Sequence, residues 1–326
     1  MTIEVDYHCT SRRPSFEDLP QGVRRLLADA AGCALSTAHP PVTSGFTGAF
    51  AALLDLADGR RVFAKAAGPS APHAKVAIPR EASVLRILDG RITAPVLVGA
   101  GAADEWEAIV LEAIDGRLPG VPWTSPDVEL AHDACLALAA FPTDEVTGLT
   151  ATSLAVDIGM DVDALATLDD LAAGRRGWPR GIRPLPADVM VRVAALAHRA
   201  GELLTGQSLV HCDLRPDNLL VTSDGVARIV DWNWVTRGPA WADFVSLWPL
   251  MARDGIDVHG LATRSPLTRD ADPDAVDAFL AVIAGYMLTH CEHPTFNTTL
   301  GVVRDHQRLM AQVFLDLLVA RRGWTC

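Results

Sequence analysis

The chain has 326 residues, of which 49% are apolar and 21% charged. This composition is typical of a soluble globular protein and excludes wholesale disorder. Its 40 acidic and 28 basic residues give a formal net charge of −12, which disfavours binding to nucleic acid phosphates and favours attraction of cations. A chain of this length is expected to form two packed lobes.

The beginning of the chain and its cysteines indicate a cytoplasmic protein. The first ten residues contain Glu4 and Asp6 and lack the apolar core of a signal peptide. The six cysteines are scattered without a Cys-x-x-Cys pair, as expected of reduced thiols. The longest uncharged stretch, residues 30–54, is interrupted by Pro40 and Pro41 and does not suit a membrane helix. We expect no membrane contact and no nucleic acid partner.

The first third of the chain predicts a small sheet with helices. Val23, Leu26 and Leu27 share one face of a helix over Pro20–Ala31, and Gly32 ends it. Asp58-Gly59 is a hairpin turn signal between two strand-like segments. The pattern predicts a further helix over Pro79–Leu88 and, in chain order, strands at Ala34–Pro41, Ala49–Ala57, Arg61–Ala67, Pro95–Ala100 and Ala108–Leu111.

Beyond Gly116 the pattern is mostly helical. Ser125-Pro126 suits the start of a helix that runs to about Ala140. Leu209–Val235 interrupts the helices and predicts a loop, a hairpin and a second loop. We therefore expect an N-terminal lobe over residues 1–111, a connector over 112–119 and a helical lobe over 120–326. Further helices are predicted at Val162–Ala173, Ala187–Leu204, Ala242–Arg253, Pro273–Thr289 and Leu300–Arg321.

The hairpin carries a candidate metal site. Its strands are joined by Asp224-Gly225, a dipeptide preferred in two-residue type I′ turns. That turn would place Asn218 opposite Asp231 at the open end, with Cβ atoms roughly 5 Å apart. An amide oxygen and a carboxylate at this spacing suit Mg²⁺, which takes few protein ligands. Asp213 lies in the loop that leads to the same end, close enough to orient a hydroxyl group.

The string His211-x-Asp213-x-x-x-x-Asn218, followed by Asp231, resembles the catalytic segment of the protein-kinase-like fold. The sequence of this segment, His-Cys-Asp-Leu-Arg-Pro-Asp-Asn, is most similar to that of the aminoglycoside phosphotransferase family. The resemblance implies a two-lobe α+β fold, with five antiparallel strands and one helix in the small lobe and a larger helical lobe. It also implies Asp213 as the catalytic base, Asn218 and Asp231 as Mg²⁺ ligands, His211 as a loop-ordering residue and Asp243 as a support beneath the loop.

Segments of the small lobe resemble the same family and follow one another along the chain in the family's order. The segment between the first two strands would cover the phosphates of ATP or GTP. The chain has only two lysines, and Lys65, rather than Lys75, stands at the end of a strand where the family has its phosphate-binding lysine. By resemblance, the nucleotide-binding residues are Ser44, Gly45, Thr47, Gly48, Lys65, its helix partner Glu81, and the backbone of Glu112 and Ile114.

These features predict a kinase for a small molecule. The segment from Asp231 to Asp243 is too short for a protein-kinase activation loop, which argues against a protein substrate. Residues 117–326 hold 17 bases and 26 acids, a charge of −9, which suits a cationic acceptor. The resemblance implies an aminoglycoside or other antibiotic, bound by a monomer or weak homodimer. Acidic residues available to line the cleft are Asp157, Asp161, Asp163, Asp169, Asp170, Asp254 and Asp257.

Three other functions remain open at this point. Related families with the same scaffold phosphorylate choline, homoserine or sugars, so a metabolic kinase is one alternative. A nucleotide-binding pseudokinase that acts as a scaffold is another, although the set of Lys65, Asp213, Asn218 and Asp231 is intact. A helical binding module without nucleotide is the third, and it would show no response to Mg-nucleotides.

Overall fold

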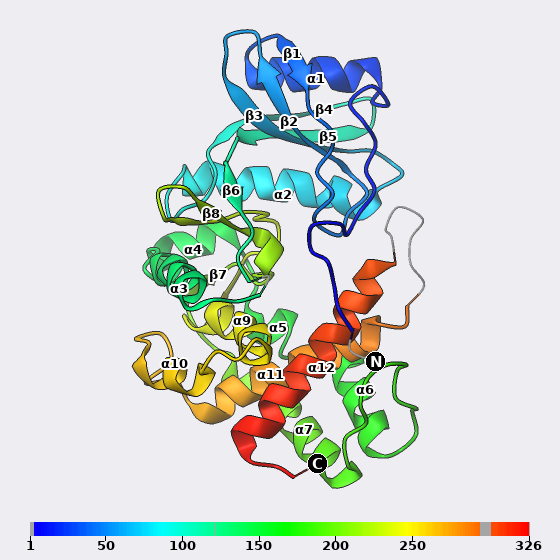
Figure 1. Cartoon of the computed structure of the whole chain (residues 1–326), viewed down its shortest axis with the longest axis vertical. Helices are drawn as coiled ribbons and strands as arrows, with labels where there is room; N and C mark the ends of the chain where they lie inside the picture. The colour runs from blue at the N-terminus through cyan, green and yellow to red at the C-terminus, as the bar shows by residue number, and fades with distance from the viewer. Residues whose placement is uncertain (1–2, 121, 294–300, 326) are drawn as a thin grey trace.

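The structure is a computed structural model that describes residues 3–120, 122–293 and 301–325. A sheet with two helices forms one lobe, and a larger helical lobe lies beneath it (Figure 1). The α+β fold with a five-stranded antiparallel sheet is thereby confirmed. Leu300 and Cys326, which belong to sequence predictions above, lie outside the described residues. The sheet lobe contains α1 (Gln21–Ala31), β1 (Leu35–Ala38), β2 (Phe50–Leu56), β3 (Arg61–Ala67), α2 (Pro72–Leu88), β4 (Leu97–Ala103) and β5 (Trp106–Glu112).

The sheet has the order β1-β2-β3-β5-β4, and every neighbouring pair is antiparallel. Side chains alternate between its faces along each strand. In β3, Val62, Ala64 and Ala66 pack in the same cluster as α1, whereas Ala67 joins the cluster that contains α2. Lys65 shares the α2 face with Ala67. The alternation therefore aims the only strand lysine at the helix that carries Glu81.

The small lobe has two helices where the kinase-like expectation counted one. The predicted Pro20–Ala31 helix forms as α1 and covers the outer face of the sheet, which would otherwise expose apolar side chains. The second helix, α2, begins at Pro72, seven residues before the predicted start at Pro79. Proline is favoured in a first helical turn, but Pro79 lies inside this helix, so it did not mark the start.

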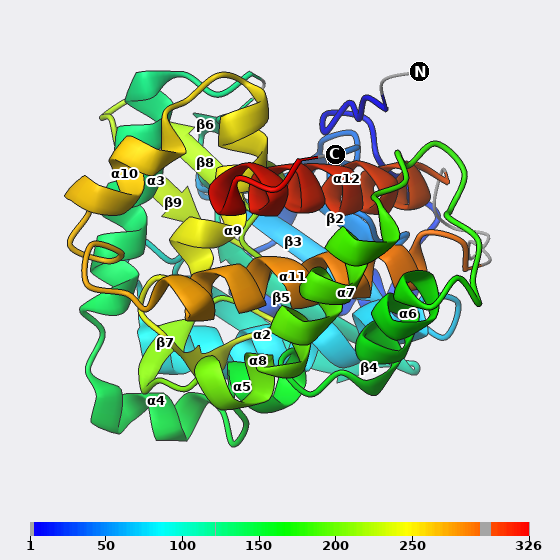
Figure 2. The same ribbon diagram turned by 90° about the horizontal axis from the view of Figure 1, so that it is seen from below.

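The helical lobe is built around α11 (Pro273–His290). It lies between α12 (Val302–Arg322), α6 (Val162–Ala172) and α7 (Ala187–His198), as Figure 2 shows. The predicted helix Ala187–Leu204 is divided at Arg199 into α7 and α8 (Ala200–Leu203). The remaining helices are α3 (Ser125–Ala139), α4 (Thr143–Leu149), α5 (Leu154–Asp157), α9 (Ala242–Arg253) and α10 (Val258–Arg264).

Short strands carry the functional loops of the helical lobe. β7 (Ser208–Val210) pairs with β10 (Thr236–Gly238), and β8 (Leu219–Thr222) pairs with β9 (Ala227–Ile229). β6 (Gly116–Arg117) follows the sheet lobe directly and pairs with β8, so the connector is fixed to the helical lobe. A 3₁₀ turn, η1, covers Pro216–Asn218.

The register of the hairpin differs by one residue from the prediction. Leu219 pairs with Ile229, and the amide of Val230 donates to the carbonyl oxygen of Asn218 at 3.0 Å. Asn218 therefore faces Val230 and not Asp231. The reason is the turn, in which Ser223, Asp224 and Gly225 form a three-residue loop and Gly225 has a φ of +78°. The Asp-Gly signal located the turn correctly but did not determine its length.

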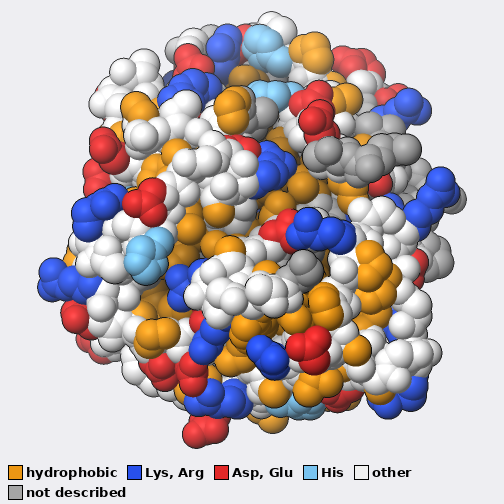
Figure 3. Space-filling view, turned by 60° about the horizontal axis from the view of Figure 1, so that its bottom comes forward, with side chains coloured by type: hydrophobic (Ala, Val, Ile, Leu, Met, Phe, Trp, Pro, Cys, Tyr) orange, Lys and Arg blue, Asp and Glu red, His pale blue; other side chains and the backbone are white. Residues whose placement is uncertain are grey.

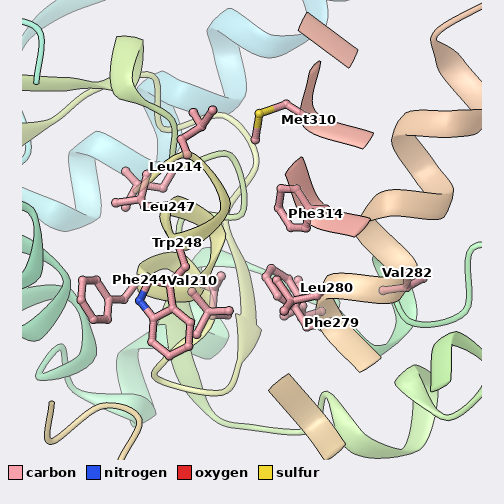
Figure 4. Close-up of a cluster of buried hydrophobic side chains, with 14 of the residues drawn as sticks. Val210, Leu214, Phe244, Leu247, Trp248, Phe279, Leu280, Val282, Met310 and Phe314 are labelled. Carbon is pink, nitrogen blue, oxygen red and sulfur yellow. The ribbon is translucent and has the colours of Figure 1, made fainter. Parts of the chain in front are cut away.

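Apolar packing anchors the loop between β7 and η1 from below. Leu214 of this loop lies in the cluster of α9, α11 and α12, together with Leu247 and Phe314 (Figure 4). The hydroxyl of Ser246 in α9 also donates to the Leu214 carbonyl oxygen at 3.1 Å. A loop held by a buried leucine and a helix hydroxyl has little freedom to move. The core of the helical lobe thus positions the residues that follow His211.

The N-terminal segment crosses from one lobe to the other. Ile3 and Val5 pack against the larger hydrophobic cluster, which includes the core of the helical lobe, and the Tyr7 hydroxyl lies 3.0 Å from Nδ1 of His306 in α12. Farther along, the Thr10 hydroxyl donates to the Gly45 carbonyl oxygen at 2.6 Å. The start of the chain therefore contacts both the helical lobe and the segment between β1 and β2.

Among the described residues no helix is long and apolar enough to cross a membrane. The five described cysteines are all unpaired. On the face drawn in Figure 3, acidic and basic side chains are interspersed and hydrophobic side chains surface between them. The acidic excess is thus not gathered into one patch on that face.

Candidate active site

Asp243, the second residue of α9, is buried beneath the loop that carries His211 and Asp213. Its carboxylate accepts the backbone amides of His211 at 2.7 Å and Cys212 at 3.0 Å. Burial raises the pKa of Asp243 to about 7, and the two amides oppose this rise. Cys212 has a φ of +67°, a backbone conformation that costs energy for a non-glycine residue. The two hydrogen bonds hold the loop in this conformation.

The His211 side chain ties the loop to the hairpin. Its Nε2 lies 3.0 Å from the carbonyl oxygen of Val230, to which it donates, and its ring meets Trp232 edge to face at 4.9 Å. Burial lowers the pKa of His211 to about 4, so the ring is neutral at pH 7. This arrangement is what a loop-ordering residue requires, because it connects the segment before Asp213 to the segment before Asp231.

Asp213 lies between Arg215 and Asn218. Arg215 donates to Asp213 Oδ1, and Nδ2 of Asn218 lies 2.8 Å from the Asp213 carbonyl oxygen and 3.3 Å from its Oδ2. Burial raises the pKa of Asp213 to about 6, while the Arg215 charge opposes the rise. A carboxylate with a pKa closer to neutrality is better suited to accept a proton near pH 7 than an ordinary aspartate.

Lys65, Glu81 and Asp231 form one ion-pair group between the lobes. The Lys65 ammonium donates to Glu81 at 2.8 and 3.0 Å and to Asp231 Oδ1 at 2.8 Å. Burial alone would raise the pKa of Asp231, but the charge and hydrogen bond of Lys65, together with the charge of Arg215, outweigh burial and lower the pKa to about 2. Asp231 is therefore ionised at neutral pH. Its φ of +69° lies in the left-handed region, two residues after β9 ends.

The side-chain oxygen atoms of Asn218 and Asp231 suit a magnesium ion. Asp231 Oδ1 accepts Lys65 and Asn233, both at 2.8 Å, while no described residue donates to its Oδ2. Asn218 uses its nitrogen toward Asp213, so its amide oxygen is directed elsewhere. A carboxylate oxygen and an amide oxygen without protein donors, on the wall of one cavity, are the donor set that Mg²⁺ prefers. No cluster of three His, Cys, Asp or Glu side chains that would suit a metal occurs among the described residues.

A cavity of about 310 Å³ lies between the lobes beside these groups. Most of the predicted nucleotide-binding residues line it, together with the apolar side chains of Phe63 and Leu111 from the sheet and Leu220 from the hairpin. Gly48 is the exception and is not part of the lining. A partly apolar cavity that is also lined by a lysine and by acidic side chains suits a nucleotide. The predicted residues along it are Ser44, Gly45, Thr47, Lys65, Glu81, Glu112, Ile114, Asn218 and Asp231.

The backbone amide of Glu112, at the start of the connector, is already hydrogen-bonded within the protein. The amide of Glu112 donates to the Val96 carbonyl oxygen at 2.9 Å, so any backbone bond from Glu112 to a ligand must use its carbonyl oxygen. The Glu112 carboxylate accepts Arg228 of β9 at 2.9 Å, and Arg228 also donates to the Thr93 and Ala94 carbonyl oxygens. The Glu112 side chain therefore joins the two lobes.

Two arginines at the site were not predicted. Arg13 donates to the carbonyl oxygens of Val42, Ser44 and Ala49 and to the Thr47 hydroxyl, so it holds the whole segment that covers the cavity. Nothing in the local sequence around Arg13 indicates this contact. Arg215, by contrast, stands within the quoted motif, and its position two residues after Asp213 could have suggested an ion pair. Its guanidinium also lies 5.0 Å from the Phe46 ring.

A second cavity, of about 1,020 Å³, opens on the other side of Phe46 and Asn233, which line both cavities. Asp213 lies on its wall. Of the seven acidic residues expected to line an acceptor cleft, only Asp157 borders it. The others serve local structure in several cases: Asp161 and Asp257 cap helices, Asp169 contacts His198, and Asp254 accepts the Trp123 amide.

Comparisons with known proteins agree with this geometry. The sequence model of the Phosphotransferase enzyme family matches residues 41–279, well over half of the chain. No curated protein sequence matches significantly. A solved aminoglycoside phosphotransferase from Alicyclobacillus acidocaldarius has a TM-score of 0.54 at 14% identity, with 95% of this chain and 99% of that chain covered.

Two further solved structures share the fold. A putative fructosamine-3-kinase from Haemophilus somnus has a TM-score of 0.55 at 14% identity, with 92% of this chain and 99% of that chain covered. The AMP-bound complex of a spectinomycin phosphotransferase has a TM-score of 0.58 at 12% identity, with 91% and 97% covered. These TM-scores show a common fold, and at such low identities they show the fold alone.

Proposed function

This chain belongs to the phosphotransferase enzyme family, and we propose that it transfers the γ-phosphate of ATP or GTP to a hydroxyl group of an antibiotic-like small molecule. The family makes it a phosphotransferase with a hydroxyl acceptor. The nucleotide, the metal and the role of each residue are the proposal. Its main support is one relationship: the cavity lined by Lys65, Asn218 and Asp231 adjoins the cavity lined by Asp213.

Asp213 is proposed as the general base. The acceptor hydroxyl would lie in the larger cavity, and its oxygen would form a bond to the γ-phosphorus while the bond from that phosphorus to the β-phosphate oxygen breaks. The hydroxyl proton passes to the Asp213 carboxylate. Such help is worth about 10²- to 10⁴-fold in rate. Arg215 keeps Asp213 ionised and oriented through its hydrogen bond.

Lys65, Asn218 and Asp231 are proposed to hold the phosphates and Mg²⁺. Glu81 fixes the Lys65 ammonium, which is directed toward the end of the cavity where the phosphates would lie. Asn218 and Asp231 supply the oxygen ligands. When bound, Mg²⁺ would neutralise charge on the transferred phosphate. Ser44, Gly45, Thr47 and Gly48 are proposed to cover the phosphates, with Arg13 holding their segment in place.

The decisive test is Mg²⁺-dependent nucleotide consumption by the wild type and Asp213→Asn, with ATP and GTP, over aminoglycosides, peptide antibiotics, macrolides and choline-like metabolites. Asp213→Asn is expected to lose at least about 10²-fold in kcat while the nucleotide still raises its Tm. Asp231→Ala is expected to lose the Mg²⁺-dependent part of that rise as well. Asp224→Asn, at the exposed tip of the hairpin, is the matched control and keeps both properties.

Each result has a clear meaning. Near-normal turnover by Asp213→Asn would show that another group is the base. Nucleotide stabilisation without turnover of any acceptor would favour a pseudokinase. A complete lack of nucleotide effect would exclude the kinase function. A cytoplasmic location and a monomer or weak homodimer remain predictions, which fractionation and size-exclusion chromatography can test.

A further inference from the structure

The larger cavity provides its own evidence on the acceptor. It is bounded by α2, by the segment that follows α4, by the loop after β9 and by α11 and α12. Its volume of about 1,020 Å³ is just above the range for pockets that bind drug-sized ligands, about 300–1,000 Å³. An alcohol as small as choline or homoserine would leave most of this space as water and contact few of its walls.

The charges on the wall do not suit a polycation. Among the described residues, the charged side chains that line the cavity are Arg80, Arg215, Asp157 and Asp213, and their formal charges cancel. Arg215 already pairs with Asp213. Asp157 accepts the hydroxyl groups of Thr152 at 2.6 Å and Thr236 at 2.9 Å. His306 is also on the wall, and burial lowers its pKa to about 3, so it is neutral. A ligand with several ammonium groups would lose water without gaining matching carboxylates.

Much of the remaining wall is apolar. Trp234, in the loop after β9, is 58% exposed and borders the cavity. Ile283, Tyr286 and Met287 line the cavity from α11, at the three- and four-residue spacing of a single helix face. Ile158 adds a further apolar side chain. An exposed tryptophan at the edge of a cavity supplies a large contact area for an apolar surface.

From this wall we infer that the acceptor is a large amphipathic alcohol with one continuous apolar face and no more than one positive charge, and that Trp234 and the Ile283–Met287 face of α11 select it. The inference rests on the proposed function, in which a phosphate group passes from the nucleotide to the acceptor. It adds the chemical class of that acceptor. The hydroxyl group would be presented to Asp213 at the polar end of the cavity. The apolar face would lie against Trp234, Tyr286 and Met287.

The test measures acceptor binding separately from transfer. Calorimetry on Asp213→Asn would be performed with erythromycin and novobiocin, which are large amphipathic glycosides, and with kanamycin and choline as the polycation and the small alcohol. We expect at least one amphipathic probe to bind, with kanamycin and choline at least 10-fold weaker. Trp234→Ala should weaken binding of the amphipathic probe at least 10-fold and Trp234→Phe less than threefold. Met160→Ala should leave this binding unchanged. Met160 is a matched control, because it is 59% exposed and does not line the cavity.

The results separate the two levels of the proposal. The inference is overturned if neither amphipathic probe binds, or if Trp234→Ala leaves the binding unchanged. Stabilisation by Mg-ATP, measured on the same samples, reports on the nucleotide site alone. If that stabilisation is present while kanamycin or choline is the acceptor, the phosphotransferase function stands and this acceptor class is wrong. If Mg-ATP has no effect, the proposed function itself fails.

Discussion

The Lys65 ammonium lies 2.8 Å from Asp231 Oδ1, and 166 positions of sequence separate the two residues. The bond joins β3 of the sheet lobe to the loop that follows β9 of the helical lobe. Glu81 holds the same ammonium from α2, and its side chain is only 2% exposed. One cation thereby connects three elements around the cavity between the lobes.

Lys65→Ala is expected to impair both nucleotide binding and stability. The substitution removes the cation that is directed at the phosphates and leaves the Glu81 carboxylate buried without its partner, which typically costs about 3–5 kcal/mol. We expect KM for the nucleotide to rise at least about 10-fold, in line with the loss of one close charge pair. Steady-state kinetics and thermal unfolding provide the two measurements.

Lys75→Ala is the natural control, because Lys75 is the only other lysine and does not line the cavity. It should leave both quantities unchanged. The double variant Lys65→Ala/Glu81→Gln should recover part of the lost stability, since the uncompensated charge is removed, without recovering activity. Unaltered nucleotide KM in Lys65→Ala would contradict the phosphate-binding role.

Arg13→Ala is expected to loosen the segment that covers the nucleotide cavity. Arg13 donates four hydrogen bonds to that segment, three of them to backbone carbonyl oxygens. Without them we expect a rise of about 10-fold in KM for the nucleotide, equivalent to about 1.4 kcal/mol, with a smaller effect on kcat. The adjacent Arg12 is exposed, so Arg12→Ala should behave as wild type. Equal effects of the two substitutions would count against a specific role of Arg13.

Asp243→Ala is expected to release the loop that carries Asp213. Two backbone amides lose their acceptor in a buried position, at a cost of about 1–3 kcal/mol each. The strained backbone at Cys212 would then relax, and kcat should fall together with Tm. Asp270→Ala, in an exposed loop, should change neither. Chemical denaturation and kcat at a temperature well below Tm separate the effect on stability from the effect on the loop.

His306 should make the protein less stable in mild acid. Burial lowers its pKa to about 3, below the ordinary value of about 6.5 in an unfolded chain. The unfolded state therefore binds a proton below pH 6.5 that the folded state refuses, and stability is lost as the pH falls. Between pH 7.5 and 5 the loss from this residue is about 2 kcal/mol.

The substitution His306→Gln keeps an acceptor for the Tyr7 hydroxyl and removes the titration. Its free energy of unfolding should fall less steeply between pH 7.5 and 5 than that of the wild type, by about 2 kcal/mol over the interval. His259→Gln, at an exposed histidine, should follow the wild-type curve. Urea unfolding at several pH values provides the measurement, and identical slopes for His306→Gln and the wild type would disprove a buried neutral His306.

The local sequence pattern was sufficient to predict most helices and strands and the order of the site residues along the chain. Strands β2 and β3 and helices α3 and α9 form within one residue of their predicted bounds, because alternation, turn residues and capping act over a few positions. The spacing of His211, Asp213 and Asn218 needs only the local chain, and this is why a sequence motif can carry it. The pairing of Lys65 with Glu81 was implied by the resemblance to the family, and in the structure strand alternation and helix α2 bring the two side chains together.

What the sequence by itself determined is therefore the fold class, the position of the hairpin and the residue types of the site. Only the tertiary structure decided the hairpin register, because a two-residue and a three-residue turn both accept Asp224-Gly225. The contacts of Arg13 with the covering segment and of Tyr7 with His306 join positions far apart in the chain, and no local pattern encodes them. The polarity of the larger cavity also depends on the tertiary structure. Several acidic residues of the second half cap helices or form surface ion pairs, whereas apolar side chains from several elements line the cavity together with Asp213.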